Sequence, residues 1–207
     1  MLNSINKVIK TLIFSDLVLL FGWGLISPIL AIFILDSIEG GGAEVAGIAI
    51  GTYWLVKSII QIPIANYLDQ NHGEKDDFFA LILGIILSSL APIGFIFARL
   101  PWHMYVLEML NALGMAMAIP SWGGIFHRHM VRNKEAFCCS LESSAVGIST
   151  GVAGILGGVL VKTLGFTPLF IGVAISGFIS ALLLLIIRKD ILLKVERDQM
   201  RPISRPR

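Results

Sequence analysis

The chain has 207 residues, of which 56% are hydrophobic and only 14% are charged. Soluble domains carry about 25% charged residues, so these charges are too few to cover the surface of a soluble domain of this length. The net charge is only +2, and we expect no nucleic-acid partner.

Six apolar segments are long enough to cross a bilayer as helices, which takes about 20 residues each. In chain order they cover residues 8–35, 45–68, 78–98, 102–126, 136–161 and 165–187. None of them alternates between apolar and polar residues as membrane β-strands do. We therefore predict an all-α membrane protein, with a six-helix transmembrane domain over residues 1–187 and a basic tail over residues 188–207.

The positive residues predict the orientation, because Lys and Arg gather on the cytoplasmic side of membrane proteins. One side of the predicted bundle has most of them, including the whole tail from Arg188 onward, whereas the other side has only Arg99 and Lys162. We expect an integral protein of the cell (inner) membrane with both termini and the tail in the cytoplasm.

The first segment shares a pattern with the fourth. Asp16 is followed by Gly22, Gly24 and Pro28, and at the same spacing Glu108 is followed by Gly114, Ala116 and Pro120. Weaker matches, in the same order, relate the second segment to the fifth (Gly47 and Gly51 to Gly147 and Gly151) and the third to the sixth (Gly84 and Ser88 to Gly172 and Ser176). Since each unit has three spans, the second copy enters the membrane from the opposite side, which predicts two inverted three-helix repeats.

The stretch from Ala65 to Lys75 resembles the loop between helices two and three of the major facilitator superfamily. That loop usually reads Gly-x-x-x-Asp-Arg/Lys-x-Gly-Arg/Lys-Arg/Lys. Asp69 and Lys75 match it, whereas Ala65 and Gln70 replace a glycine and a basic residue, and Gly73 comes one place late.

Two further stretches resemble the same family. In the fourth segment, Asn111 and Gly114 match the pattern Leu-x-x-x-Arg-x-x-Gln-Gly-x-Gly-x-Ala at its Gln and Gly, but Glu108 stands where Arg is usual. In the fifth, Gly157 and Gly158 match the end of a glycine-rich pattern. The resemblance covers nearly the whole chain, and it corresponds to the N-terminal six-helix half of a family member.

The resemblance implies secondary-active transport of a small solute by alternating access, with protons as a candidate driving ion. Half of the usual fold leaves half of the cavity wall, so we expect a homodimer or a separate six-helix half as partner. The resemblance also implies that Asp69 acts in gating, with Arg128 or Arg132 as its partner. The alternative is that Asp69 and the acids after it keep a loop in water and cap the third helix.

Ionisable residues inside the spans predict the site. Asp16, Lys57 and Glu108 each cost about 2.5–3.5 kcal/mol at mid-membrane, so we assign them to a cavity and to ion coupling. Lys57 and Glu108 are candidates for an ion pair, which would be either static or functional, and Asp16 could instead reach cytoplasmic water. Glu142 is expected at the membrane interface.

Helical periodicity places further side chains on the same faces as these charges. We predict solute contacts from aromatic, amide and Met residues, namely Trp23, Tyr53, Asn111, Met115 and Trp122. A stripe of small residues in the fifth segment is predicted to pack against another helix, in this chain or in the second half; it consists of Gly147, Gly151, Gly154 and Gly158.

Other chemistry finds little support. The four histidines lie at segment ends, the two cysteines are adjacent, and no phosphate-binding Gly-Lys-Ser/Thr loop occurs. We expect no enzyme activity, no metal and no cofactor. The rival function is a non-transporting scaffold, assembly partner or sensor, which the changed Asp69 loop and the Glu at position 108 favour.

Overall fold

The computed structural model describes residues 6–70, 74–131 and 133–191. These residues form helices and connecting turns, with no strand among them. The elements are α1 (Lys7–Ile26), α2 (Leu30–Ser37), α3 (Ala43–Gln70), α4 (Glu74–Phe95), α5 (Pro101–His129), α6 (Glu135–Leu164), α7 (Phe166–Leu184) and the 3₁₀ turn η2 (Leu185–Ile187). The predicted all-α class is confirmed. Nearly all of the predicted basic tail, and Arg132 of the expected gate, lie outside the described residues.

Local sequence determines where several helices begin and end. The Asn6 side chain accepts a hydrogen bond from the Val8 amide at 3.1 Å and so caps α1. Before α5, His103 Nδ1 accepts from the amides of Arg99 and Leu100, at 3.1 and 3.2 Å. The turn from α6 to α7 needs a positive φ of 79° at Gly165, which a glycine adopts without steric cost.

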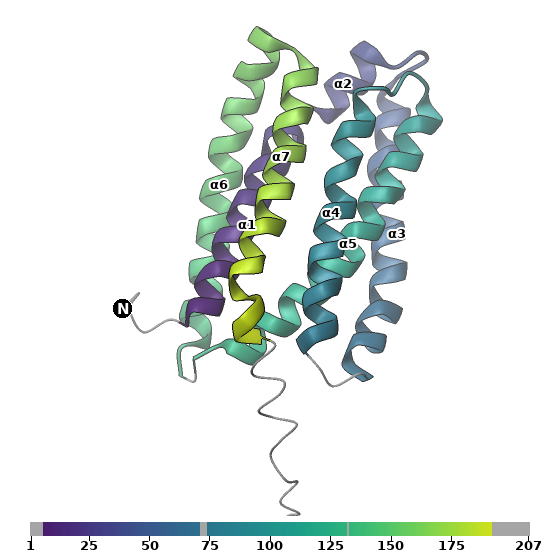
Figure 1. Cartoon of the computed structure of the whole chain (residues 1–207). Coiled ribbons are helices and arrows are strands. Elements are labelled where there is room, and N and C mark those ends of the chain that lie inside the picture. Colours follow the sequence, from purple (N-terminus) through teal and green to yellow (C-terminus); the bar gives the residue numbers. More distant parts are fainter. Residues whose placement is uncertain (1–5, 71–73, 132, 192–207) are drawn as a thin grey trace, which may run out of the picture.

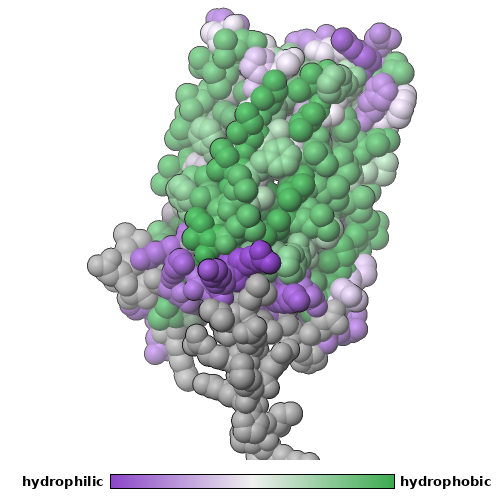
Figure 2. Space-filling view, in the orientation of Figure 1, coloured by the Kyte–Doolittle hydropathy of each residue, from purple (hydrophilic) through white to green (hydrophobic). Residues whose placement is uncertain are grey.

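The molecule is an upright bundle with an apolar middle and polar ends. Six of the described helical stretches are long and apolar enough to cross a membrane. Figure 2 shows the broad apolar band between two polar rims. We call the end where α1 begins and α7 ends the basic end, and the opposite one the far end. The protein is an integral membrane protein, as expected.

The first predicted span is not one continuous helix. α1 ends at Ile26 and α2 begins at Leu30, with Pro28 in the break. Proline has no N–H to donate to the carbonyl four residues earlier, and the Ile29 amide bonds to Ile26 O at 3.0 Å instead. Pro120, the matching proline of the fourth span, lies inside the unbroken helix α5.

Two groups of three helices make up the bundle (Figure 1). α1 packs on α6 and α7, α5 packs on α3 and α4, and the groups meet mainly where α4 contacts α7. This pattern is unchanged when α1 is exchanged with α5, α3 with α6 and α4 with α7. The packing therefore has the symmetry that the predicted repeat requires.

Close helix contacts follow the same symmetry. A Cβ at Gly22 would collide with Ser176, and a Cβ at Gly114 would lie 3.0 Å from Ser88 Cα. The sequence pattern had matched Gly22 with Gly114 and Ser88 with Ser176. Equivalent residues thus make equivalent contacts, on α1 with α7 and on α5 with α4.

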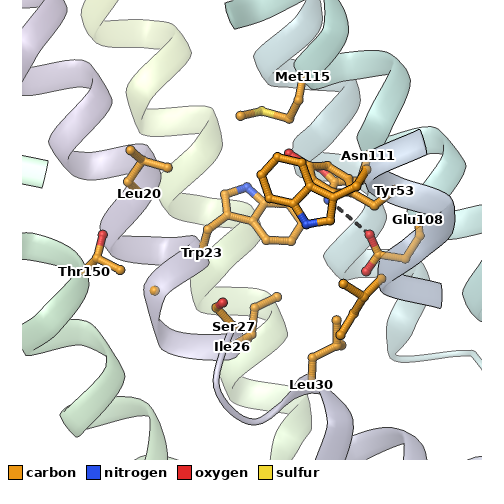
Figure 3. A pocket seen from close by; sticks show the side chains of 13 residues that line it. Leu20, Trp23, Ile26, Ser27, Leu30, Tyr53, Glu108, Asn111, Met115 and Thr150 are labelled. Atoms are coloured by element: carbon orange, nitrogen blue, oxygen red, sulfur yellow. Dashed lines mark hydrogen bonds between the residues drawn. The ribbon is translucent and has the colours of Figure 1, made fainter. Parts of the chain in front are cut away.

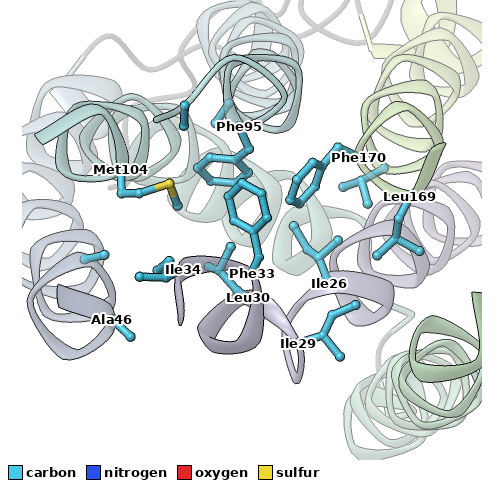
Figure 4. Packing of buried hydrophobic residues seen from close by; sticks show 14 of the residues in the cluster. Ile26, Ile29, Leu30, Phe33, Ile34, Ala46, Phe95, Met104, Leu169 and Phe170 are labelled. Carbon is cyan, nitrogen blue, oxygen red and sulfur yellow. The ribbon is translucent and has the colours of Figure 1, made fainter. Parts of the chain in front are cut away.

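An aromatic cluster closes the far end of the bundle. Phe33 of α2 lies between α4 and α7 (Figure 4). The centroid of the Phe170 ring is 4.8 Å from that of Phe33 and 5.5 Å from that of Phe95. All three side chains are at most 5% exposed. This cluster fixes α2 against the bundle and so holds the break at Pro28 in place.

The helices α3 and α6 are the least buried of the six spans. On α3, Ile59 and Ile62 are 70% and 72% exposed, and on α6 Ile155 is 74% exposed. The two helices are equivalent in the predicted repeat. One apolar face of each of these two helices therefore lacks protein cover among the described residues.

The glycine stripe of α6 does not pack against another helix of this chain, which was one of the two expectations. A Cβ at Gly147, Gly151 or Gly158 would meet none of the described atoms within 4 Å, and one at Gly154 would meet only Gly24 O and Pro28 Cγ, both at 3.9 Å. The close contact is made by Gly157, which packs on the backbone of Leu25. The helix is turned so that the stripe faces outward.

Candidate functional site

A cavity of about 330 Å³ lies between the two groups of helices, on the far-end side of Leu20 and Met115. We call it the Glu108 cavity. It brings together five residues predicted for the site, which are Trp23, Tyr53, Glu108, Asn111 and Met115. The other lining residues are mainly apolar: Leu20, Gly24, Ile26, Ser27, Leu30, Ile50, Trp54 and Thr150. Figure 3 shows Trp23 and Tyr53 between the Glu108 carboxylate and α1.

Glu108 is only 3% exposed, and its known partner is neutral. Asn111 Nδ2 lies 3.4 Å from its Oε2, and Ser88 Oγ donates to Asn111 Oδ1 at 2.7 Å. The carboxylate has no ion-pair partner among the described residues. Ser88 was identified only as a repeat position, and its role in orienting Asn111 had no signal in the sequence.

Lys57 does not pair with Glu108 as the sequence had allowed. Its Nζ lies 4.5 Å from the centroid of the Trp54 ring and 5.8 Å from that of Tyr53. These two residues precede Lys57 by about one turn on α3, and side chains three and four residues apart are neighbours on a helix. The ammonium is therefore held by the aromatic rings of its own helix.

A second cavity of about 270 Å³ lies toward the basic end, and we call it the Asp16 cavity. It brings Asp16 and Trp122 together with Glu142, a residue that the sequence had placed at the interface. Leu20 and Met115 line both cavities. Asp16 and Glu108 are thus assigned to neighbouring cavities on either side of these two side chains, and not to a single site.

The Asp16 cavity contains polar groups without partners. Neither Asp16 nor Glu142 has an ion pair or hydrogen bond within the described part of the chain. The indole Nε1 of Trp122 is buried and has no hydrogen-bond partner there. Its ring stacks on Phe126 with a centroid distance of 4.5 Å.

At the basic end, Arg128 pairs with acids other than Asp69, its expected partner. It contacts the Asp77 carboxylate directly, and its Nε lies 3.6 Å from Glu74 Oε1. His129 Nε2 lies 3.5 Å from the second oxygen of Glu74. Glu74 and Asp77 are three residues apart on one face of α4 and are 7% and 5% exposed. They therefore join α4 to α5 and do not serve as solvated loop acids.

A comparison of the sequence with models of protein families identifies the family. A model of the Major Facilitator Superfamily matches residues 12–205, nearly the whole chain. The chain belongs to the major facilitator superfamily. A search among curated proteins finds no match.

Membership makes this major facilitator chain a membrane transporter of that type, and the predicted family is confirmed. The walls of both cavities come from helices of both groups. The position where the fourth-helix pattern has Arg is occupied by Glu108, so the charge in the main cavity is reversed.

Proposed function

We propose that this major facilitator chain carries a small solute by alternating access, with the Glu108 cavity as a solute site. The observation that supports it most directly is the pair of cavities, one toward each end, that share Leu20 and Met115 as walls. A solute passing from one cavity to the other would pass these two side chains. Leu and Met are flexible apolar residues, and Met in particular adapts to irregular contacts.

Proton coupling is the proposed energy source. Asp16 and Glu108 occupy equivalent positions of the repeat, and each lines one cavity. A carboxylate inside a membrane is costly in free energy unless a counter-ion, water, a ligand or a bound proton compensates its charge. A proton could therefore bind at Glu108 from one side and at Asp16 from the other.

The proposal includes a second half. The exposed faces of α3 and α6 flank the cavities, and α6 presents three glycines with open space in front of them. Small residues let helix backbones approach closely in membranes. The partner is a second copy of this chain or a separate six-helix half.

The charged cluster at the basic end is the proposed gate. Arg128, Asp77 and Glu74 connect the ends of α4 and α5, and Asp69 at the end of α3 adds a carboxylate nearby. Separation of α3 from this cluster would change the opening at that end.

Uptake by proteoliposomes tests the proposed function. We expect a proton gradient to drive uptake of at least one member of a radiolabelled solute panel, and the Glu108→Gln and Asp16→Asn variants to abolish the response to the gradient. Equal background flux in all three proteins would contradict transport. It would favour a scaffold, assembly partner or sensor, for which the unusual Glu108 and the altered Asp69 loop are the supporting observations.

A further inference from the structure

The Glu108 cavity combines features that favour one class of solute. We propose that it binds a small organic cation, an amine or a quaternary ammonium group. The proposal rests on the proposed function only in treating this ligand as the transported solute. Binding itself follows from the cavity's charge, from the end of α1 that lines it and from its aromatic walls.

The first feature is a carboxylate without a cation. Glu108 is 3% exposed, and Asn111 is its only described hydrogen-bond donor, at 3.4 Å. No Lys, Arg or His is among the described residues that line the cavity. A ligand with a positive charge would provide the missing counter-ion, whereas an anion would face an uncompensated negative charge.

The second feature is the end of α1. Because residue 28 is proline, the Gly24 carbonyl lacks the N–H that would normally bond to it, and Gly24 lines the cavity. The carbonyl end of a helix also has a partial negative charge. Ser27, the last-turn residue beside it, lines the cavity as well and adds a hydroxyl oxygen.

The third feature is the aromatic wall formed by Trp23, Tyr53 and Trp54. Faces of Trp and Tyr attract cations, and such walls are typical of sites for quaternary ammonium groups. The chain gives its own example, since the Lys57 ammonium lies 4.5 Å from the Trp54 centroid. Lys57 does not line the cavity and is not paired with Glu108, so the carboxylate stays available to a ligand.

The experiment measures equilibrium binding of benzyltrimethylammonium to the full chain in lipid nanodiscs by tryptophan fluorescence. Benzenesulfonate, an anion of similar size, and empty nanodiscs are the controls. We expect saturable binding of the cation and none of the anion. Glu108→Gln should weaken cation binding by about tenfold or more, and Asp36→Asn, the matched change at an exposed carboxylate of α2 that lines neither cavity, should leave it within about twofold.

Four further variants protect the test against a folding artefact. Glu108→Asp keeps the charge and should retain most of the binding. Lys57→Gln removes the nearby ammonium and should leave binding equal or tighter, because a competing positive charge is lost. Pro28→Ala restores a donor for the Gly24 carbonyl and should weaken binding several-fold, while Pro120→Ala in the unbroken α5 should not.

Equal affinity of the wild type and Glu108→Gln would overturn the proposal, and so would binding of benzenesulfonate as tight as that of the cation. The two proposals fail separately. Cation binding without any flux in proteoliposomes would refute transport but keep the ligand class. Flux of another solute without cation binding would keep transport and refute the ligand class.

Discussion

The charged side chains inside the bundle have neighbours of different kinds. Glu108 receives a hydrogen bond from an amide, Lys57 lies over two aromatic rings, and Arg128 pairs with two buried acids. Asp16 lines a cavity with another carboxylate. The charges of Glu108 and Asp16 need a ligand, water or a proton to balance them. Arg128, in contrast, already has its acidic partners at the basic end.

At the residue scale, removal of Arg128 should destabilise the bundle. Arg128→Gln leaves the buried carboxylates of Asp77 and Glu74 without their guanidinium, and we expect a loss of about 1–3 kcal/mol in the free energy of unfolding, less than for a fully buried pair because the Arg128 side chain is 40% exposed. Equilibrium unfolding in mixed detergent micelles measures it. Adding Asp77→Asn should recover part of the loss, and a double variant as unstable as the sum of both single changes would contradict the pairing.

At the scale of elements, small residues determine how closely the helices pack. Gly114 of α5 and Gly84 of α4 face each other, and a Cβ at either would lie 2.5 Å from the carbonyl oxygen of the other. Gly22 of α1 approaches Ser176 of α7, as Gly114 approaches Ser88 of α4, but a Cβ at Gly172, the position matched to Gly84, would meet none of the described atoms within 4 Å. The glycine-to-serine approach thus occurs in both groups of helices, whereas the glycine-to-glycine contact occurs only between α4 and α5.

Substitution of Gly114 tests this packing. Gly114→Ala places a methyl group against rigid backbone of α4, and we expect the free energy of unfolding to fall by about 1–3 kcal/mol. Gly123→Ala on the same helix is the control, because a Cβ there meets none of the described atoms within 4 Å; it should be neutral or slightly stabilising. The ranking is read from unfolding midpoints of the two proteins. If both changes were equally mild, the close contact would not stabilise the fold.

At the scale of the whole molecule, one face of the bundle is incomplete. The exposed apolar residues of α3 and α6 and the outward glycine stripe lie beside the cavities. Lipid can cover apolar helices, but under the proposed function it could not form the wall of a hydrated passage. The proposed partner, a second copy or a separate half, would complete that wall.

Cysteine cross-linking in membranes distinguishes these partners. In a background with Cys138 and Cys139 replaced by Ser, Gly151→Cys on the stripe should form a covalent dimer if two copies meet there. Ile175→Cys on α7, where the native side chain is 51% exposed, should not. Gly151→Cys chains that stay monomeric would rule out the homodimer through this face and leave the separate half as the partner.

The sequence by itself determined the all-α membrane class, the six spans, the family and five of the residues that line the Glu108 cavity. Apolar length decides spanning, and the spacing of Trp23, Asn111 and Met115 on helical faces predicts which side chains share a wall. The repeat pattern also identified glycines and serines that meet in space. These features are local, or recur at a fixed distance along the chain, so they can be read without the fold.

The tertiary structure alone decided which helices face each other and how each is turned. It placed Asp16 and Glu108 in different cavities, paired Arg128 with Asp77 in place of Asp69, and turned Gly157 toward α1 while the stripe faces outward. The physical reason is that helices in a membrane are apolar on every side. Their hydrophobic pattern therefore does not select the buried face, and close packing of small residues does.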